Sequence, residues 1–105
     1  MGARRELDAD EDLQPVVEDH GTVFVQFHAD WCAPCAVLET FFDEVLDDLD
    51  GLVVRVDVET HDDLADAHDV TANPTLLVFE DGSVVERRAG LPDRSAFREL
   101  VSPWT

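Results

Sequence analysis

Two cysteines at the junction of a strand-like and a helix-like segment constrain the fold of this chain more than any other feature. Cys32 and Cys35 are the only cysteines in the sequence. The apolar, β-branched run over residues 22–29 predicts a strand, and apolar residues recur at helical spacing over residues 36–49. Pro34 suits the first turn of that helix, because its φ is fixed and it has no N–H to donate. We therefore expect the pair at a helix N-terminus.

A helix N-terminus favours the thiolate form of a nearby cysteine. Its unpaired backbone N–H groups and the helix dipole place partial positive charge at that end. We expect Cys32, just ahead of the helix, to be exposed and activated, and Cys35, one turn in, to be shielded and less reactive. On this hypothesis Cys32 attacks a substrate disulfide and Cys35 resolves the intermediate.

A Cys-x-x-Cys pair can instead close a structural disulfide, ligate half of a zinc site or anchor a haem. Closing so short a loop gains little entropy, and structural disulfides are rare in the cytosol. Zinc would require two further ligands from the four histidines, and no second pair of ligands has finger-like spacing. A c-type haem site requires histidine directly after the second cysteine, where this chain has Ala36. The haem site is excluded, and a redox role is favoured over the other two.

Strand-like and helix-like segments alternate along the chain and end in a hairpin. Predicted strands lie at residues 4–7, 23–27, 52–58, 75–79 and 84–88, and predicted helices at about 12–19, 36–49, 61–68 and after Asp93. Asp81-Gly82 between the last two strands predicts a tight turn. This order predicts an α/β fold with a mixed central sheet, an antiparallel last hairpin and helices on both faces.

Two of the predicted helices carry apolar positions that should face the sheet. The short helix over residues 61–68 is expected to pack Leu64 and Ala67. The helix after the cysteines has the clearest apolar stripe, formed by Val37, Leu38, Phe41, Phe42, Val45, Leu46 and Leu49.

Beyond these patterns, the chain resembles the thioredoxin family. Trp31-Cys32-Ala33-Pro34-Cys35 after an apolar strand looks like the active site of that family. Asn73-Pro74-Thr75 and the apolar run that follows resemble its cis-proline segment, while Asp81-Gly82 and Gly90 resemble its hairpin turn and late glycine. The likeness extends from about residue 7 to residue 101. It implies the thioredoxin fold and a single domain, residues 1–105.

The resemblance also implies a substrate-binding surface around the two catalytic cysteines. The proline at position 74 is cis in the family and lies against the cysteine pair, and the residue before it offers backbone groups to an extended substrate. Trp31 is a large aromatic residue beside a reactive thiol, which indicates substrate contact more than a core position. The residues expected to bind substrate are Trp31, Ala33, Pro34, Asn73, Pro74 and Gly90.

The chain departs from the family pattern close to the cysteines. Gln26 stands where thioredoxins usually have a buried aspartate beneath the second cysteine, and an amide cannot take a proton from a thiol. His28, on the same strand face, either replaces that carboxylate or fills a place that the family usually gives to an aromatic residue. Ala36, Ala33 and Thr40 replace the usual lysine, glycine and helix-kinking proline. Gln26 and His28 are therefore candidate redox-tuning residues, and the redox potential and the reductase partner stay open.

The charge balance is strongly acidic. There are 25 Asp and Glu residues against 7 basic residues, all of them arginine, for a net charge of −18. Such a surface repels nucleic acid and anionic membranes, so we expect neither as a partner. A salt-rich cytoplasm, such as that of a halophile, would screen the repulsion among carboxylates; an acidic protein from an ordinary cytosol is the alternative. The sequence has no apolar leader or membrane-length apolar run, which predicts a cytoplasmic protein.

We hypothesise a thiol-disulfide oxidoreductase that reduces protein disulfides. Cys32 would form a mixed disulfide with the substrate, and Cys35 would displace the reduced product. We expect no bound cofactor or metal, a monomer, and electrons supplied by a flavoprotein that resembles thioredoxin reductase. A donor or oxidant dedicated to one partner, and a non-catalytic thioredoxin-like binding adaptor, are the alternatives.

Overall fold

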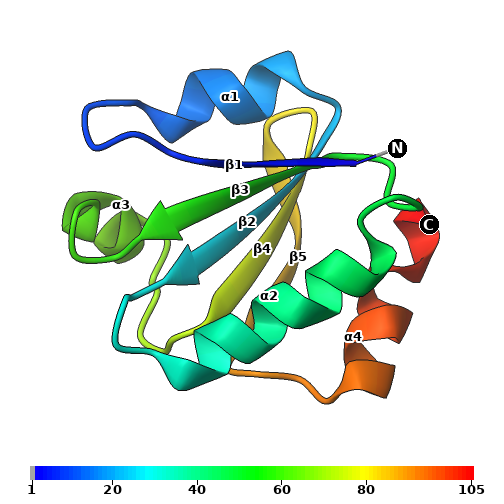
Figure 1. The fold of residues 1–105 in the computed structure, drawn as a ribbon. Helices are drawn as coiled ribbons and strands as arrows, with labels where there is room; N and C mark the ends of the chain where they lie inside the picture. The colour runs from blue at the N-terminus through cyan, green and yellow to red at the C-terminus, as the bar shows by residue number, and fades with distance from the viewer. Residues whose placement is uncertain (1) are drawn as a thin grey trace.

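A five-stranded sheet runs between two layers of helices (Figure 1). The computed structural model describes residues 2–105, so the first residue of the predicted 1–105 domain lies outside it. The strands follow the spatial order β1-β3-β2-β4-β5; β1 and β2 pair parallel with β3, and β4 pairs antiparallel with both β2 and β5. This confirms the predicted mixed sheet. The strands are β1 (Ala3–Glu6), β2 (Thr22–His28), β3 (Leu52–Asp57), β4 (Thr75–Glu80) and β5 (Ser83–Ala89).

The helices divide between the two faces of the sheet, as predicted. Side chains of α2 and α4 pack with Phe24 of β2 on one face, whereas side chains of α1 and α3 pack with Val25 of the same strand on the other (Figure 1). None of the helices within residues 2–105 has the length and apolarity required to span a membrane. The helices are α1 (Leu13–Asp19), α2 (Ala33–Val45), α3 (Asp62–Ala67), α4 (Arg94–Val101) and the 3-10 turn η1 (Ser102–Trp104).

The hairpin between β4 and β5 forms at the predicted residues. Asp81 and Gly82 connect the strands, with φ values of 51° and 87°. Successive positive φ values match the twist of an antiparallel pair and favour glycine and aspartate. The Asp-Gly signal therefore identified both the turn and its position.

The apolar stripe of α2 is narrower and shorter than predicted. Val37 is 41% exposed, which corrects its assignment to the buried face. The buried positions follow the i, i+3, i+4, i+7 pattern of a single stripe, and residue 37 lies at its edge. The helix ends at residue 45 and not 49, although Leu49 is still buried just after the turn that follows. The buried α2 residues are Cys35, Leu38, Phe41, Phe42 and Val45.

The predicted burial of Ala67 in α3 is also wrong. Ala67 is exposed, and Ala65 is the buried residue of this helix. The helix ends at residue 67, and the ring of His68 takes the place beside the sheet, with ring centroids 6.4 Å from Phe27 and 5.8 Å from Phe79. An aromatic ring at the helix end therefore does the packing that the sequence pattern assigned to alanine.

Arginines tie α2 to its neighbours. Arg4 of β1 pairs with Asp43, and Arg94 and Arg98 of α4 both hydrogen-bond to Glu44. These contacts lie in the last turn of α2, where acidic side chains would otherwise oppose the helix dipole. The hydrogen bonds from Arg94 and Arg98 lower the pKa of the Glu44 carboxyl.

Candidate active site

Cys32 and Cys35 form a disulfide at the N-terminus of α2. Their Cα atoms are 5.3 Å apart, and Cys32 is the N-cap residue, with its Sγ accepting a hydrogen bond from the Cys35 backbone N at 3.2 Å. Pro34 lies in the first turn, as predicted. The backbone N–H of Cys35, in the first turn of the helix, thus points at the sulfur of Cys32, which is the arrangement that stabilises a thiolate.

Both cysteines are buried in this disulfide form. Cys32 is 6% exposed and Cys35 is 3% exposed, so the expected exposure of Cys32 is wrong here. The bond between the sulfurs holds both residues in one small apolar cluster, packed against Ala29 and Val58. The difference between the two sulfurs therefore comes from their place relative to the helix end, and not from exposure in the oxidised chain.

An exposed aromatic residue flanks the cysteines. Trp31 is 70% exposed, and its indole Nε1 donates a hydrogen bond to Glu59 Oε1 at 3.0 Å. Ala33 and Pro34, between the cysteines, are exposed as well. Trp31 is thus a surface residue held in place by one carboxylate.

The segment around Pro74 reaches the same edge of the sheet. The Asn73-Pro74 peptide bond is cis, as predicted, and Pro74 is buried. Phe27 of β2 and Thr75 of β4 are partners in the antiparallel pair, so residues 73–74 lie beside the end of the strand that leads to the cysteines. The backbone N of Gly90 donates to the Pro74 carbonyl at 2.8 Å. The predicted residues Asn73, Pro74 and Gly90 therefore come together.

Gln26 lies beneath the second cysteine. It is fully buried, and its Nε2 donates a hydrogen bond to the Cys35 carbonyl at 3.3 Å. Within residues 2–105, its Oε1 atom has no hydrogen-bond partner. An amide with an unpaired buried acceptor costs stability and cannot act as a base.

His28 contacts a chain of ion-paired side chains on the same face of the sheet. It is 4% exposed, and its Nε2 lies 3.0 Å from Glu6 Oε2 on β1. The other oxygen of that carboxylate, Glu6 Oε1, accepts a hydrogen bond from an Arg55 terminal nitrogen at 2.7 Å. Arg55 Nε in turn pairs with Glu39 on α2. These four residues, His28, Glu6, Arg55 and Glu39, are called the charged chain below.

A small open cavity joins the charged chain to the cysteines. Its volume is about 130 Å³, and both cysteines contribute to its wall together with His28, Glu39 and Arg55. Sequence reasoning found His28 but missed the other three members of the charged chain. Glu39 lies four residues after Cys35, a spacing that places both on one helix face and could have found it. Glu6 and Arg55 meet through the pairing of β1 with β3, which carries no local signal.

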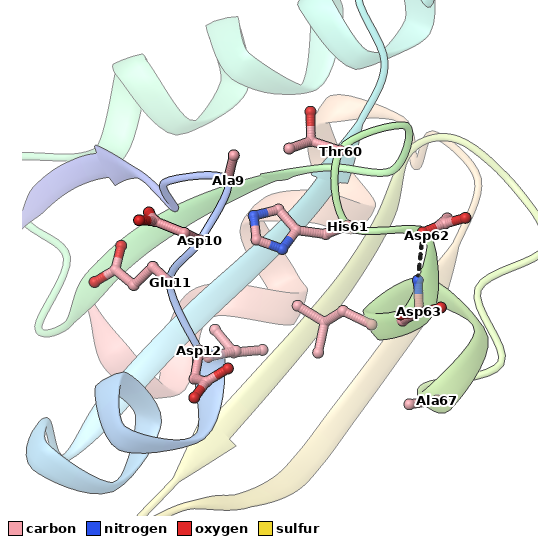
Figure 2. Close-up of a pocket in the computed structure, with 11 residues that line it drawn as sticks. Ala9, Asp10, Glu11, Asp12, Thr60, His61, Asp62, Asp63 and Ala67 are labelled. Atoms are coloured by element: carbon pink, nitrogen blue, oxygen red, sulfur yellow. Dashed lines mark hydrogen bonds between the residues drawn. The ribbon is translucent and has the colours of Figure 1, made fainter.

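A second pocket lies away from the cysteines. It has a volume of about 430 Å³ between the start of α1 and the start of α3, and Figure 2 shows His61 among acidic side chains there. A hydrogen bond from Arg5 lowers the pKa of one of them, Glu11. In the part of the chain that the structure describes, no group of three or more His, Cys, Asp or Glu side chains is placed to hold a metal ion.

Known proteins match this chain in sequence. Residues 6–102 match the family model described as Thioredoxin. A thioredoxin from Mycoplasmoides gallisepticum is 31% identical over 91 residues, which cover 86% of this chain and 91% of that protein. Mitochondrial thioredoxin from Bos taurus is 40% identical over 88 residues, which cover 82% of this chain and 53% of that protein. The chain thus spans about half the length of the mitochondrial relative.

Solved structures match its fold. A mutant thioredoxin from Halobacterium salinarum NRC-1 superposes with a TM-score of 0.85 at 34% identity, covering 98% of this chain and 91% of that one. A thioredoxin from Schistosoma mansoni gives a TM-score of 0.86 at 28% identity, with 98% and 96% covered. The thioredoxin fold predicted from sequence is thereby confirmed. Because the Cys-x-x-Cys pair is present and joined as a disulfide at the helix N-terminus, this chain belongs to the thioredoxin family and is a thiol-disulfide oxidoreductase.

Proposed function

We propose that the reduced chain reduces disulfides in client proteins, with Cys32 as the attacking sulfur. The Cys32 thiolate attacks one sulfur of the client disulfide, which breaks that bond and forms a mixed disulfide. The Cys35 thiolate then attacks Cys32, which forms the Cys32–Cys35 bond and releases the client as a dithiol carrying two electrons more. The observation that carries this order is the position of Cys32 at the N-cap, where its Sγ accepts the backbone N–H of Cys35.

The client would bind across the exposed surface next to the cysteines. Trp31, Ala33 and Pro34 would contact its side chains, while Asn73, Pro74 and Gly90 would contact its backbone. An extended client segment that pairs with the backbone at residue 73 is a form of strand addition. The exposure of Trp31 and the contact of Gly90 with Pro74 support this placement.

A flavoprotein of the thioredoxin-reductase type would return electrons to the Cys32–Cys35 disulfide. Thioredoxin relatives in general work with such reductases and with disulfide-containing substrates. We propose that the chain acts as a monomer without bound cofactor or metal, and that its net charge of −18 keeps nucleic acids away.

The working environment proposed for the chain is a salt-rich cytoplasm. Its strongly acidic composition supports this, and so does its similarity to a thioredoxin of Halobacterium salinarum. Potassium chloride shortens the screening length from about 10 Å at 0.1 M to about 3 Å at 1 M, which weakens repulsion among exposed carboxylates. The melting midpoint should therefore rise along a potassium chloride series. A midpoint independent of salt would favour an ordinary cytosol.

Trapping distinguishes the proposed reaction from a binding adaptor. The wild-type chain with a dithiol donor should reduce the disulfides of insulin, whereas Cys32→Ser should be inactive. Cys35→Ser should accumulate a one-to-one mixed disulfide with its client, because the resolving sulfur is gone. Equal alkylation rates at Cys32 and Cys35 in the reduced chain would contradict the assigned order. Measuring the potential of the Cys32–Cys35 couple then separates a general reductant from an oxidant or a dedicated donor.

A further inference from the structure

The resolving cysteine must lose its proton inside the protein. Cys35 is 3% exposed, and only its thiolate can attack the mixed disulfide. The side chain that contacts it from the sheet is the amide of Gln26, which donates to the Cys35 carbonyl and cannot accept a thiol proton. A proton acceptor therefore has to reach Cys35 from another direction.

Besides the cysteines and Arg55, the cavity beside the cysteines is lined by three side chains that could accept a proton. Glu39 is paired with Arg55, and Asp30 is exposed to solvent. His28 is 4% exposed, and an imidazole is the side chain whose ordinary titration range includes neutral pH. The cavity of about 130 Å³ has room for a water molecule between Cys35 and the imidazole. His28 is thus the acceptor that the surroundings favour.

Glu6 determines which ring nitrogen of His28 can accept a proton. An ionised carboxylate only accepts hydrogen bonds, so the Nε2 atom 3.0 Å from Glu6 Oε2 must carry the hydrogen. In the neutral imidazole, the other ring nitrogen, Nδ1, is then left with a free lone pair. Arg55 holds the second oxygen of the same carboxylate at 2.7 Å, which restricts the rotation of Glu6.

We propose that Glu6 is a positioning residue that makes His28 the proton acceptor for Cys35. This inference rests on the proposed order of attack, in which Cys35 resolves the mixed disulfide. The Cys35 proton passes to His28 Nδ1 directly or through one water, the resulting thiolate forms the bond to Cys32, and the bond from Cys32 to the client breaks. The proton on His28 is then free to neutralise the departing client thiolate. The charged and titratable groups around His28 are Glu6, Asp8, Asp30, Glu39, Arg55 and Asp57.

A glutamine at position 6 gives a sharp test of this role. Arg55 has only donors, so it would hold the amide oxygen, and the amide NH₂ would then face His28 Nε2. That reverses the tautomer, so Nδ1 would carry the hydrogen and could no longer accept one. The matched control is Glu44→Gln. Glu44 lies on α2 and is also a carboxylate held by arginines, in this case Arg94 and Arg98 of α4.

Reaction of the reduced chain with 5,5′-dithiobis(2-nitrobenzoate) separates the two steps. The first released thionitrobenzoate reports the attack by Cys32, and the second reports resolution by Cys35. At neutral pH we expect the second phase to slow about 100-fold in His28→Gln and about 10-fold in Glu6→Gln. The first phase, and both phases of Glu44→Gln, should stay within about two-fold of wild type. The pH profile of the second phase should lose its imidazole step in His28→Gln.

Nitrogen NMR of the imidazole gives a readout that a purely structural role would not change. The reduced wild type should show His28 with hydrogen on Nε2, and Glu6→Gln should show it on Nδ1. A wild-type ring with hydrogen on Nδ1, or a Glu6→Gln variant that resolves at the wild-type rate, would overturn the proposal. Failure of the proposed function would look different, since the first phase would then not depend on Cys32.

Discussion

The layer between the sheet and α2 has two unlike ends. One end, called the aromatic end, consists of Phe24, Phe42 and Phe97, with ring centroids 6.1 Å and 4.8 Å apart in successive pairs. The other, called the polar end, holds Gln26 and His28 on the same face of the same strand. Helix α2 crosses both ends, since it begins with the cysteines and carries Phe42 two turns later. One helix thus joins a stabilising region to a reactive one.

The opposite face of β2 shows that the polar end is a local exception. There Val23, Val25 and Phe27 are all fully buried and apolar along the whole strand. Burying an unpaired polar atom costs about 1–3 kcal/mol, so the fold alone would not select Gln26. The buried polar side chains of this strand are Gln26, which hydrogen-bonds to the Cys35 carbonyl, and His28, which shares a cavity with both cysteines. The comparison teaches that the unpaired buried acceptor, and its cost in stability, lie at the end of the strand that leads to the cysteines.

The largest effect on stability should come from the aromatic end. Phe42→Ala removes a fully buried ring, which should lower the free energy of unfolding by about 3–5 kcal/mol in urea titrations. The alkylation rate of Cys32 in the folded chain should be unchanged, because Phe42 does not contact the cysteine cluster. Val37→Ala on the exposed side of the same helix is the control, with an expected change within about 0.5 kcal/mol. If Phe42→Ala lowered the free energy of unfolding as little as Val37→Ala does, the division into an aromatic end and a polar end would be contradicted.

Replacing the exposed Trp31 should have the opposite pattern of effects from replacing Phe42, with a loss of activity and little change in stability. Trp31→Ala should lower kcat/KM for client reduction about 10-fold, or about 1.4 kcal/mol, as expected for an interface aromatic residue. Its effect on unfolding should stay within about 0.5 kcal/mol, since the side chain is mostly solvent-exposed. Glu59→Gln, which keeps an acceptor for the indole N–H, serves as the control. Unchanged kinetics would remove Trp31 from the client-binding surface.

At the polar end, removing a buried polar group should stabilise the chain. Gln26→Leu gives up one hydrogen bond to Cys35, which is worth about 0.5–1.5 kcal/mol, and relieves an unpaired acceptor that costs about 1–3 kcal/mol. We expect a net gain of about 1 kcal/mol in the free energy of unfolding. Val25→Thr, which adds a hydroxyl on the apolar face, should destabilise. A destabilised Gln26→Leu would mean that the amide serves the fold after all.

The smallest effect on stability should come from His68, which packs on the opposite face of the sheet from His28. Burial lowers the pKa of His68, and Arg87 lowers it further, while Asp69 opposes the shift. The unfolded chain therefore binds a proton at His68 more readily than the folded chain does. The free energy of unfolding should fall as the pH drops from the ordinary pKa of histidine towards the lower pKa of His68 in the folded chain. His68→Gln should flatten that part of the curve of unfolding free energy against pH. Parallel curves for the variant and wild type would contradict the shift.

Local patterns were sufficient for most of the fold and for the reactive pair. The strand before Cys32, the helix after Cys35 and the Asp81-Gly82 turn all depend on neighbours in sequence, which periodicity and turn chemistry report. The cis bond at Pro74 required the family resemblance, because most X-Pro bonds are trans.

The remaining features depend on contacts between distant segments or on redox state. Glu6 meets His28 across 22 positions of sequence, through the neighbouring strands β1, β3 and β2. Val37 lies at the edge of an apolar stripe, where a pattern cannot tell a buried position from an exposed one. The low exposure of Cys32 is a property of the disulfide form, and no local residue pattern indicated it.

The position of β1 at the edge of the sheet has a consequence for the activity of the chain. The strand is four residues long and pairs with β3 alone, and most of its residues face solvent. Edge elements of this kind open in local fluctuations that native-state hydrogen exchange detects well below the free energy of global unfolding. Each such opening separates Glu6 from the imidazole while the rest of the sheet stays intact. On the role proposed for Glu6, fraying at this edge of the sheet changes the chemistry of the sulfurs in a chain that is otherwise still folded.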